Sequence, residues 1–308
     1  MDWFGFLNLN KPRGPSSFDL IRPLQRRLGR GVKIGHAGTL DPTASGVLIV
    51  CLGAATRLVE LVQTGDKEYV TLARLGATST TDDSEGGISP TAGAPTGAAA
   101  NGPVGDAPAR EAVEQAVRAF VGIIDQVPPA HSAVLVDGRR AYDLARAGKP
   151  VNLTPRPVTV HELRVLEYAW PELRLAVRCG SGTYIRSLVR DIGQRLGVGG
   201  YCLEIQRTRV GIFRLEDAVA PDSLTLEVLE RQLVDPVIVI PPAGRLVVTD
   251  DQARQLTLGQ PLKYDLPAPA RAASVLAAIT PAGRLLGLLR YESPPGGGLL
   301  WPERMLVS

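Results

Sequence analysis

Cysteine and histidine are both scarce in this chain. The three cysteines are Cys51, Cys179 and Cys202, and the three histidines are His36, His131 and His161. The cysteines are odd in number, widely spaced and in apolar surroundings, which favours buried thiols in a reducing cytosol over a disulfide framework. No histidine stands at a zinc-ligand spacing from them, so we expect no metal site.

Long apolar runs are also missing. No run reaches the roughly 20 residues that a membrane-spanning helix needs. The first residues do not show the charged, apolar and small-residue pattern of a secretory signal peptide. These features argue against a membrane protein and against a secreted one, and we expect a cytoplasmic protein.

The remaining composition is that of an ordinary globular protein, with 44% hydrophobic and 21% charged residues. A chain of 308 residues can hold one large domain and a small one. The net charge is only +3, but residues 20–40 carry five basic residues and no acid, and residues 186–214 are also basic. These segments form a phosphate-binding stripe if they meet in the fold; the alternative is scattered, solvated charge.

The hydrophobic pattern mixes strands and helices, which predicts an α+β fold with a mixed or antiparallel sheet flanked by helices. Strands are predicted over residues 4–9, 69–75, 157–169, 172–179 and 210–213, and helices over residues 56–63, 109–120, 139–147, 184–196 and 224–233. A further helix that starts at Ser16 or Ser17 and ends at Gly29 is expected to turn Phe18, Ile21, Leu24 and Leu28 inward.

Two stretches of biased composition divide the chain. In residues 87–108, 17 of the 22 residues are Gly, Ala, Pro or Thr, and no apolar periodicity is present. Such a segment cannot bury enough surface to offset its ordering entropy, so we predict a disordered surface insertion. The Pro-Pro-Ala-Gly stretch at residues 241–244 is the best linker. We therefore predict one domain over residues 1–241 and a small β-rich domain over residues 242–308.

Residues 35–46 form the strongest candidate site, with the sequence Gly-His-Ala-Gly-Thr-Leu-Asp-Pro-Thr-Ala-Ser-Gly. Glycines at this density let a backbone approach a ligand closely or adopt a positive φ. Pro42 biases Asp41 toward an extended conformation, and the apolar run at residues 47–52 anchors the loop to the core. On this pattern alone, Asp41 is either a turn residue or a site carboxylate.

Several short blocks accompany this loop along the chain. They are Lys11-Pro12-x-Gly14, Gly53-x-Ala55-Thr56, Lys67-x-Tyr69, Leu75-Gly76 with Asp83, Pro128-Pro129 with Ser132-Ala133, Gly138-Arg139-x-Ala141-Tyr142, Gly182-Thr183-Tyr184-Ile185-Arg186 with Asp191-x-Gly193, Arg207-Thr208 with Gly211 and Phe213, and Pro302-x-Arg304. Each block is weakly specific, but their order and spacing resemble the bacterial tRNA pseudouridine synthase B (TruB) family over nearly the whole chain. The chain departs from the family pattern at His131, usually Tyr, at Ile205, usually Leu, and in the insertion at residues 87–108.

The resemblance implies a pseudouridine synthase catalytic domain followed by a PUA-like RNA-binding domain. The reaction detaches uracil from C1′ of a uridine, rotates it and reattaches it through C5, with no cofactor and no metal. The implied substrate is the T-loop uridine of tRNA (position 55 in tRNA numbering), flipped out of its stack. The expected partner is the T-arm of tRNA, with no membrane partner, and we expect a monomer.

The resemblance also assigns residues to the site. Asp41 matches the catalytic carboxylate, either as the nucleophile at C1′ or as the group that removes the 2′ proton. Arg186 matches the arginine that pairs with it, and Tyr69 matches the residue that stacks on the base or helps to remove the C5 proton. The implied substrate-binding residues are His36, Lys11, Tyr184, Ile205 and Asp83. Lys11 either supports the loop or touches phosphate.

Two other classes of function remain open at this stage. A non-catalytic RNA-binding or tRNA-folding protein needs basic faces but not the pair of Asp41 and Arg186. An aspartyl phosphatase or ATPase is suggested by Gly38-Thr39-Leu40-Asp41, but those enzymes place the aspartate before the Gly-Thr. Archaeal and eukaryotic relatives that work inside guide-RNA particles share the motifs, and activity of the protein alone separates the cases.

Overall fold

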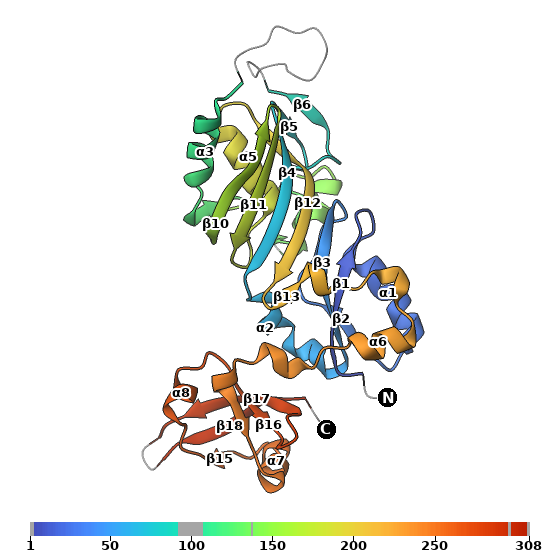
Figure 1. Cartoon of the computed structure of the whole chain (residues 1–308), viewed down its shortest axis with the longest axis vertical. Helices are drawn as coiled ribbons and strands as arrows, with labels where there is room; N and C mark the ends of the chain where they lie inside the picture. The colour runs from blue at the N-terminus through green and yellow to red at the C-terminus, as the bar shows by residue number, and fades with distance from the viewer. Residues whose placement is uncertain (1–2, 92–106, 137, 295–296, 307–308) are drawn as a thin grey trace.

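A long mixed sheet runs through most of the chain in the computed structural model, which describes residues 3–91, 107–136, 138–294 and 297–306 (Figure 1). Its strands follow the order β1-β3-β12-β4-β11-β10-β7, with β2 beside β3 and β13 beside β12. Their bounds are β1 Gly5–Lys11, β2 Ile34–His36, β3 Ala44–Leu52, β4 Lys67–Leu75, β7 Gly122–Gln126, β10 Arg156–Ala169, β11 Glu172–Cys179, β12 Gly200–Val210 and β13 Phe213–Arg214. The predicted α+β class with a mixed sheet is confirmed.

One parallel pairing sets the position of the candidate loop. Neighbouring strands pair antiparallel except β3 and β12, where Ile205 lies opposite Ala44 and Arg207 opposite Gly46. Gly46 has a φ of 102°, and a Cβ atom there would lie 2.2 Å from the carbonyl oxygen of Arg207. Only glycine allows this close approach of the two strands. Because β2 also pairs with β3, residues 37–43 form the loop of a hairpin at this junction.

Helices cover the sheet and bury its apolar side chains. They are α1 Ser17–Leu28, α2 Val59–Gln63, α3 Arg110–Arg118, α4 Ala141–Arg146, α5 Ile185–Arg195 and α6 Leu226–Gln232, with a 3-10 helix η1 at Gly53–Leu58 before α2. Helices α3 and α5 lie together in the upper half of Figure 1. Leu188 and Ile192 of α5 share a buried cluster with Leu75 and Leu173 of the strands. This packing fixes α5, and therefore Arg186, against the sheet.

Helix α1 begins and ends as predicted, but its apolar face is different. Ser16 caps it in a capping box with Asp19, whereas Phe18 is 55% exposed. The prediction that Phe18 faces inward was wrong. The buried face starts one residue earlier, at Ser17, and continues through Ile21 and Leu24 at helical spacing. Ser17 is buried because its hydroxyl donates to the carbonyl of Leu40, 3.0 Å away, and accepts from the amide of Leu40, 2.9 Å away.

The ends of the predicted insertion are ordered. Strands β5 (Ala77–Ser79) and β6 (Ile88–Pro90) pair as a hairpin, and the amide of Thr91 donates to the carbonyl of Gly76 at 3.1 Å. At the other end, the hydroxyl of Tyr168 donates to the carbonyl of Pro108 at 2.7 Å. The prediction of disorder was therefore wrong for residues 87–91 and 107–108, because backbone pairing and a tyrosine contact stabilise them. Residues 92–106 lie outside the described residues.

A second sheet with the order β14-β16-β17-β18-β15 forms the C-terminal end of the molecule. Its strands are β14 Arg245–Val247, β15 Leu262–Lys263, β16 Leu276–Ile279, β17 Leu285–Glu292 and β18 Leu299–Met305, with helices α7 Asp250–Thr257 and α8 Ala268–Arg271 beside them. Leu285 and Leu288 join Phe6 and Ile49 in one buried cluster, so the two sheets share a packed contact. The domain boundary at residues 241 and 242 and the PUA-like character stay predictions.

A short hairpin of β8 (Leu135–Val136) and β9 (Arg139–Arg140) precedes α4. Asp137 of the predicted Asp137-Gly138 turn lies outside the described residues.

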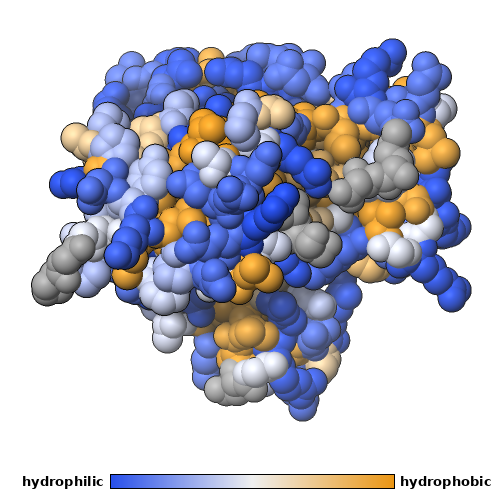
Figure 2. All heavy atoms as spheres, turned by 90° about the horizontal axis from the view of Figure 1, so that it is seen from below, coloured by the Kyte–Doolittle hydropathy of each residue, from blue (hydrophilic) through white to orange (hydrophobic). Residues whose placement is uncertain are grey.

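All three cysteines are buried and unpaired, as predicted. In the part of the chain that the structure describes, no helix is both long and apolar enough to cross a membrane. Seen from its C-terminal end, the surface is mostly hydrophilic with hydrophobic patches between (Figure 2).

Candidate active site

Asp41 lies in the hairpin loop between β2 and β3, and its side chain is 39% exposed. One of its oxygens, Oδ2, lies 2.7 Å from Nη2 of Arg186, whose side chain is only 4% exposed. A charge-assisted contact of this length is strong and directional. The loop therefore presents a partly open carboxylate with a buried cation behind it.

Arg186 holds three separate segments together. Its Nη1 donates to the carbonyl of Thr81 at 2.9 Å, and its Nη2 donates to the carbonyl of His131 at 3.0 Å. Nη1 also lies 3.5 Å from Oδ2 of Asp83, which is buried. A guanidinium is suited to this task because its fork of donors is planar and rigid. Arg186 thus joins the Asp41 loop, the turn after β5 and the segment before β8.

Lys11 supports the Asp41 loop through hydrogen bonds to its backbone. Its ammonium nitrogen donates to the carbonyl oxygens of Pro12, Pro42 and Ala44, at 2.9, 3.4 and 2.6 Å. The residue is fully buried. Burial lowers the pKa of Lys11 from 10.5 to about 8, a shift that the charge of Asp41 opposes and that of Arg207 adds to. Of the two roles expected for Lys11, this geometry fits support of the loop.

Arg207 on β12 also binds the backbone of this loop. The sequence did not reveal this role. Its Nε donates to the carbonyl of Val47 at 2.8 Å, and its Nη2 donates to the carbonyl of Gly38 at 3.0 Å. Its Nη1 lies 3.4 Å from the carbonyl oxygen of Thr39. The only sequence signal was its place in the Arg207-Thr208 block. The backbone on both sides of Asp41 is therefore held by buried cations.

We expect Lys11→Met to change how stability depends on pH. Between pH 8 and 10.5 the unfolded chain still holds the Lys11 proton that the folded chain has released. Because the unfolded state then binds more protons, Lys11 makes the free energy of unfolding rise with pH in this window, by at most about 1.4 kcal/mol per pH unit. Urea unfolding from pH 7 to 10 should show the parent gaining stability relative to Lys11→Met. A constant or falling difference would contradict the shifted pKa.

Tyr69 and Ile205 line neighbouring strands beside the loop. Tyr69 of β4 lies opposite Arg207 on β12 and is partly exposed. Burial raises the pKa of the Tyr69 phenol, although the nearby Arg207 acts in the opposite direction and Asp41 adds to the rise. Ile205 is buried between Ala44 of β3 and Thr71 of β4. Ile205 therefore lies beside the strand that follows the Asp41 loop, and Tyr69 is close enough to Asp41 to feel its charge.

His36 lies in β2, one residue before the loop, and is half-buried. Burial lowers the pKa of His36, and the charge of Arg207 lowers it further. Its Nδ1 is buried without a hydrogen-bond partner among the described residues. Both effects favour the neutral ring, and its Nδ1 stays unpartnered among the described residues.

Tyr184 is the N-cap residue of α5 and is fixed by a buried glutamine. Its amide donates to Oε1 of Gln126 at 2.8 Å, and its carbonyl accepts from Nε2 of Gln126 at 3.1 Å. Burial raises the pKa of Tyr184, and the charges of Asp41 and Arg186 also act on the phenol. Tyr184 thus lies near the ion pair, and Gln126 is a second supporting residue that the sequence did not reveal.

Asp83 faces inward and not toward solvent. Its Oδ1 accepts from the hydroxyl of Thr81 at 2.6 Å and from the amide of Glu85 at 3.0 Å, while Oδ2 faces Arg186. In this structure, Asp83 supports Arg186, so direct substrate contact by Asp83 stays a prediction without geometric support.

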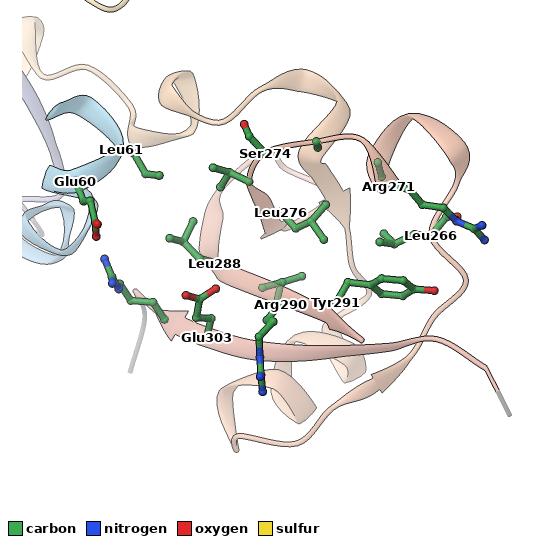
Figure 3. Close-up of a pocket in the computed structure, with 15 residues that line it drawn as sticks. Glu60, Leu61, Leu266, Arg271, Ser274, Leu276, Leu288, Arg290, Tyr291 and Glu303 are labelled. Carbon is green, nitrogen blue, oxygen red and sulfur yellow. The ribbon is translucent and has the colours of Figure 1, made fainter. Parts of the chain in front are cut away.

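A cavity lies elsewhere, between α2 and the C-terminal sheet (Figure 3). Its volume is about 450 Å³, and its lining includes Glu60 and Leu61 of α2 and Leu288 and Tyr291 of β17. None of the predicted site residues lines it. Among the residues that the structure describes, no three His, Cys, Asp or Glu side chains are grouped so as to hold a metal ion.

Protein chains in two solved assemblies have a similar fold. The chain aligns over its full length with 86% of a chain in a structure of an H/ACA RNP bound to a substrate RNA containing 2'-deoxyuridine, with 25% identity and a TM-score of 0.69. It aligns over 99% of its length with 85% of a chain in the crystal structure of a Cbf5-Nop10-Gar1 complex, with 27% identity and a TM-score of 0.68. The fold is that of the pseudouridine synthases.

Sequence comparisons identify the family. Residues 26–185 match the TruB family pseudouridylate synthase (N terminal domain). A tRNA pseudouridine synthase B from Leifsonia xyli subsp. xyli is 41% identical over 300 residues, 94% of this chain and 93% of the relative. The enzyme of that name from Thermobifida fusca is 39% identical over 297 residues, 94% of this chain and 95% of the relative. The chain belongs to the TruB family of pseudouridine synthases.

Proposed function

We propose that this protein converts the T-loop uridine of tRNA at position 55 into pseudouridine, with Asp41 as the reacting carboxylate. The observation that carries the proposal is the pair of Asp41 and Arg186, in which the carboxylate is open to solvent while its cation is buried. The names of the bacterial relatives support tRNA as the substrate. The T-loop position is proposed from the resemblance of the motif blocks.

The geometry leaves one oxygen of Asp41 for the reaction. Arg186 holds Oδ2, and Oδ1 makes no hydrogen bond within the described ranges. The free oxygen either attacks C1′ as uracil leaves with the electrons of the glycosidic bond, or it accepts the 2′ proton as that bond breaks. Both routes need an anionic oxygen beside the sugar.

The neighbouring side chains fit the walls of a nucleoside pocket. The raised pKa of Tyr69 keeps its proton in place at neutral pH, so we favour stacking on the uracil over removal of the C5 proton by a phenolate. Ile205 supplies an apolar wall, and His36 is proposed to fill the place that the flipped nucleotide leaves. Tyr184 is proposed to contact the substrate from the start of α5.

The basic segments contribute in different ways. Arg26, Arg27, Arg30 and Lys33, in and after α1, are exposed, and none has an ion-pair partner among the described residues. The basic segment at residues 186–214 instead turns Arg186 and Arg207 inward. A phosphate-binding stripe made from both segments therefore cannot include Arg186 or Arg207, because these two buried side chains build the site. We propose that the exposed surface of α1 contacts RNA phosphates and that the C-terminal domain also binds RNA.

The test is incubation of the purified protein alone with an unmodified tRNA transcript, followed by mapping of pseudouridine. We expect modification at position 55 only, without guide RNA, and binding that weakens steeply as salt rises. Modification at another position would contradict the T-loop assignment, and a need for guide RNA would place the protein with the guide-dependent relatives. A cytoplasmic, monomeric protein is proposed as well, and light scattering in solution checks the monomer.

A further inference from the structure

Besides the pair of Asp41 and Arg186, a second ion pair joins Asp82 to Arg190 of α5. Asp82 has a φ of 60°, the only positive φ at a non-glycine residue in the described chain. Its carboxylate is 14% exposed and accepts from Nη1 of Arg190 at 2.9 Å. Successive side chains of an extended strand point to opposite faces, but the left-handed conformation of Asp82 departs from that pattern. Asp82 and Asp83 both face α5, where they meet Arg190 and Arg186, which lie one helical turn apart.

Arg190 connects two of the segments that Arg186 also connects. Its Nη2 donates to the carbonyl of Val127 at 2.9 Å, and the hydroxyl of Ser187 donates to the same carbonyl at 2.8 Å. Its Nε donates to Oδ1 of Asp191 at 2.8 Å, which fixes the orientation of the guanidinium. Both Arg186 and Arg190 of α5 therefore bind the turn after β5 and the segment that leads to His131.

We propose that Asp82 and Arg190 are positioning residues for the reaction, because they hold the residue 81–83 turn in the place from which Thr81 and Asp83 orient Arg186 against Asp41. Neither residue touches the substrate; both act through Arg186. The inference rests on the proposed function. Asp82 is costly to keep charged, since burial raises its pKa while Arg190 and Arg186 oppose the rise. A mostly buried acid in a left-handed backbone conformation persists only where the surrounding structure holds it there.

Three substitutions at one position separate charge from backbone. Asparagine tolerates a positive φ, so Asp82→Asn keeps the turn and removes the charge. Asp82→Gly keeps the backbone and removes the whole side chain, whereas Asp82→Ala also strains the backbone. We expect Asp82→Asn and Asp82→Gly to lower kcat about 10- to 100-fold, the size expected when a catalytic group is misplaced by about 1 Å. KM should stay within about twofold, because the substrate contacts are untouched.

A double-mutant cycle tests the coupling. If the two side chains act as one device, Arg190→Gln should lower kcat by a similar factor, and Asp82→Asn with Arg190→Gln should be little worse than either alone. The matched control is Glu114→Gln, which breaks an ion pair with Arg110 on the surface of α3 and should leave kcat unchanged. The proposal is overturned if Asp82→Asn keeps kcat within twofold, if KM rises in place of a fall in kcat, or if the two effects multiply.

A crystal structure of Asp82→Asn provides a readout that does not depend on activity. The proposal requires the contact between Arg186 Nη2 and Asp41 Oδ2 to lengthen beyond hydrogen-bond distance, and a contact kept at 2.7 Å would overturn it. If the parent protein modifies no tRNA, the proposed function fails, and this structural comparison still decides whether Asp82 positions Arg186.

Discussion

Replacing Asp41 with asparagine is expected to abolish pseudouridine formation while tRNA binding stays within roughly tenfold, about 1.4 kcal/mol, of the parent. The amide keeps the shape of the side chain but cannot supply the anionic oxygen that either route needs. The loop should keep its conformation, because Lys11, Ser17 and Arg207 form hydrogen bonds with its backbone and not with the carboxylate of Asp41. Tritium release from C5-labelled uridine in tRNA measures turnover, and filter binding measures affinity.

The chain offers a matched control for this substitution. Asp66 has a side chain of similar exposure, 36%, and also faces an arginine, with 3.4 Å between its Oδ2 and Nη1 of Arg178. It lies outside the proposed site, so Asp66→Asn should retain turnover. If Asp41→Asn keeps even a tenth of parental turnover, Asp41 is not the reacting carboxylate. If Asp66→Asn is equally inactive, the loss reflects general damage to the protein.

The loop and its partner could be predicted because their signals are local. A glycine-rich stretch around one aspartate marks the loop, and the Gly182–Arg186 block marks the start of α5 just after a strand of alternating pattern. The resemblance supplied the pairing of Asp41 with Arg186, two residues far apart in the sequence. The ion pair of 2.7 Å has the geometry that this pairing requires.

Strand β12 could not be predicted, although it lies between β3 and β4 at the centre of the sheet. Only its last residue fell inside a predicted strand. Its sequence, Gly-Tyr-Cys-Leu-Glu-Ile-Gln-Arg-Thr-Arg-Val, places charged residues where a central strand normally has apolar ones. Arg207 is nevertheless buried, because the loop carbonyls satisfy its guanidinium, and bulge-like register shifts disturb the alternation. At position 207, the need to hold the loop carbonyls therefore outweighs the apolar pattern that is usual in a central strand.

The burial of the supporting residues could not be predicted for a similar reason. Lysine and aspartate are usually surface residues, so nothing in the sequence marks Lys11 or Asp83 as buried. Their partners are backbone carbonyls, backbone amides and a distant arginine, and these contacts exist only once β1, β3 and α5 have come together. The same limit applies to Asp82, whose left-handed backbone has no sequence signal other than a pair of aspartates in a turn.

Replacing Arg186 is expected to cost both activity and stability. In Arg186→Ala, Asp41 loses the group that orients it, and the carbonyls of Thr81 and His131 lose their donor. The carboxylate of Asp83 also stays buried without a cation, and breaking a buried ion pair in this way costs about 3–5 kcal/mol. Arg186→Lys should recover only part of either property, because one ammonium group cannot reproduce the planar fork.

A second substitution separates the two losses. Arg186→Ala combined with Asp83→Asn removes the uncompensated buried charge, so urea unfolding should show that part of the lost stability returns. Turnover should not return, because Asp41 still lacks its partner. Since Asp41 and Arg186 would serve one step, Asp41→Asn with Arg186→Ala should be little slower than Asp41→Asn alone. If turnover recovers together with stability in the combined Arg186→Ala and Asp83→Asn variant, Arg186 serves the fold and not the reaction, and the proposed site loses its central pair.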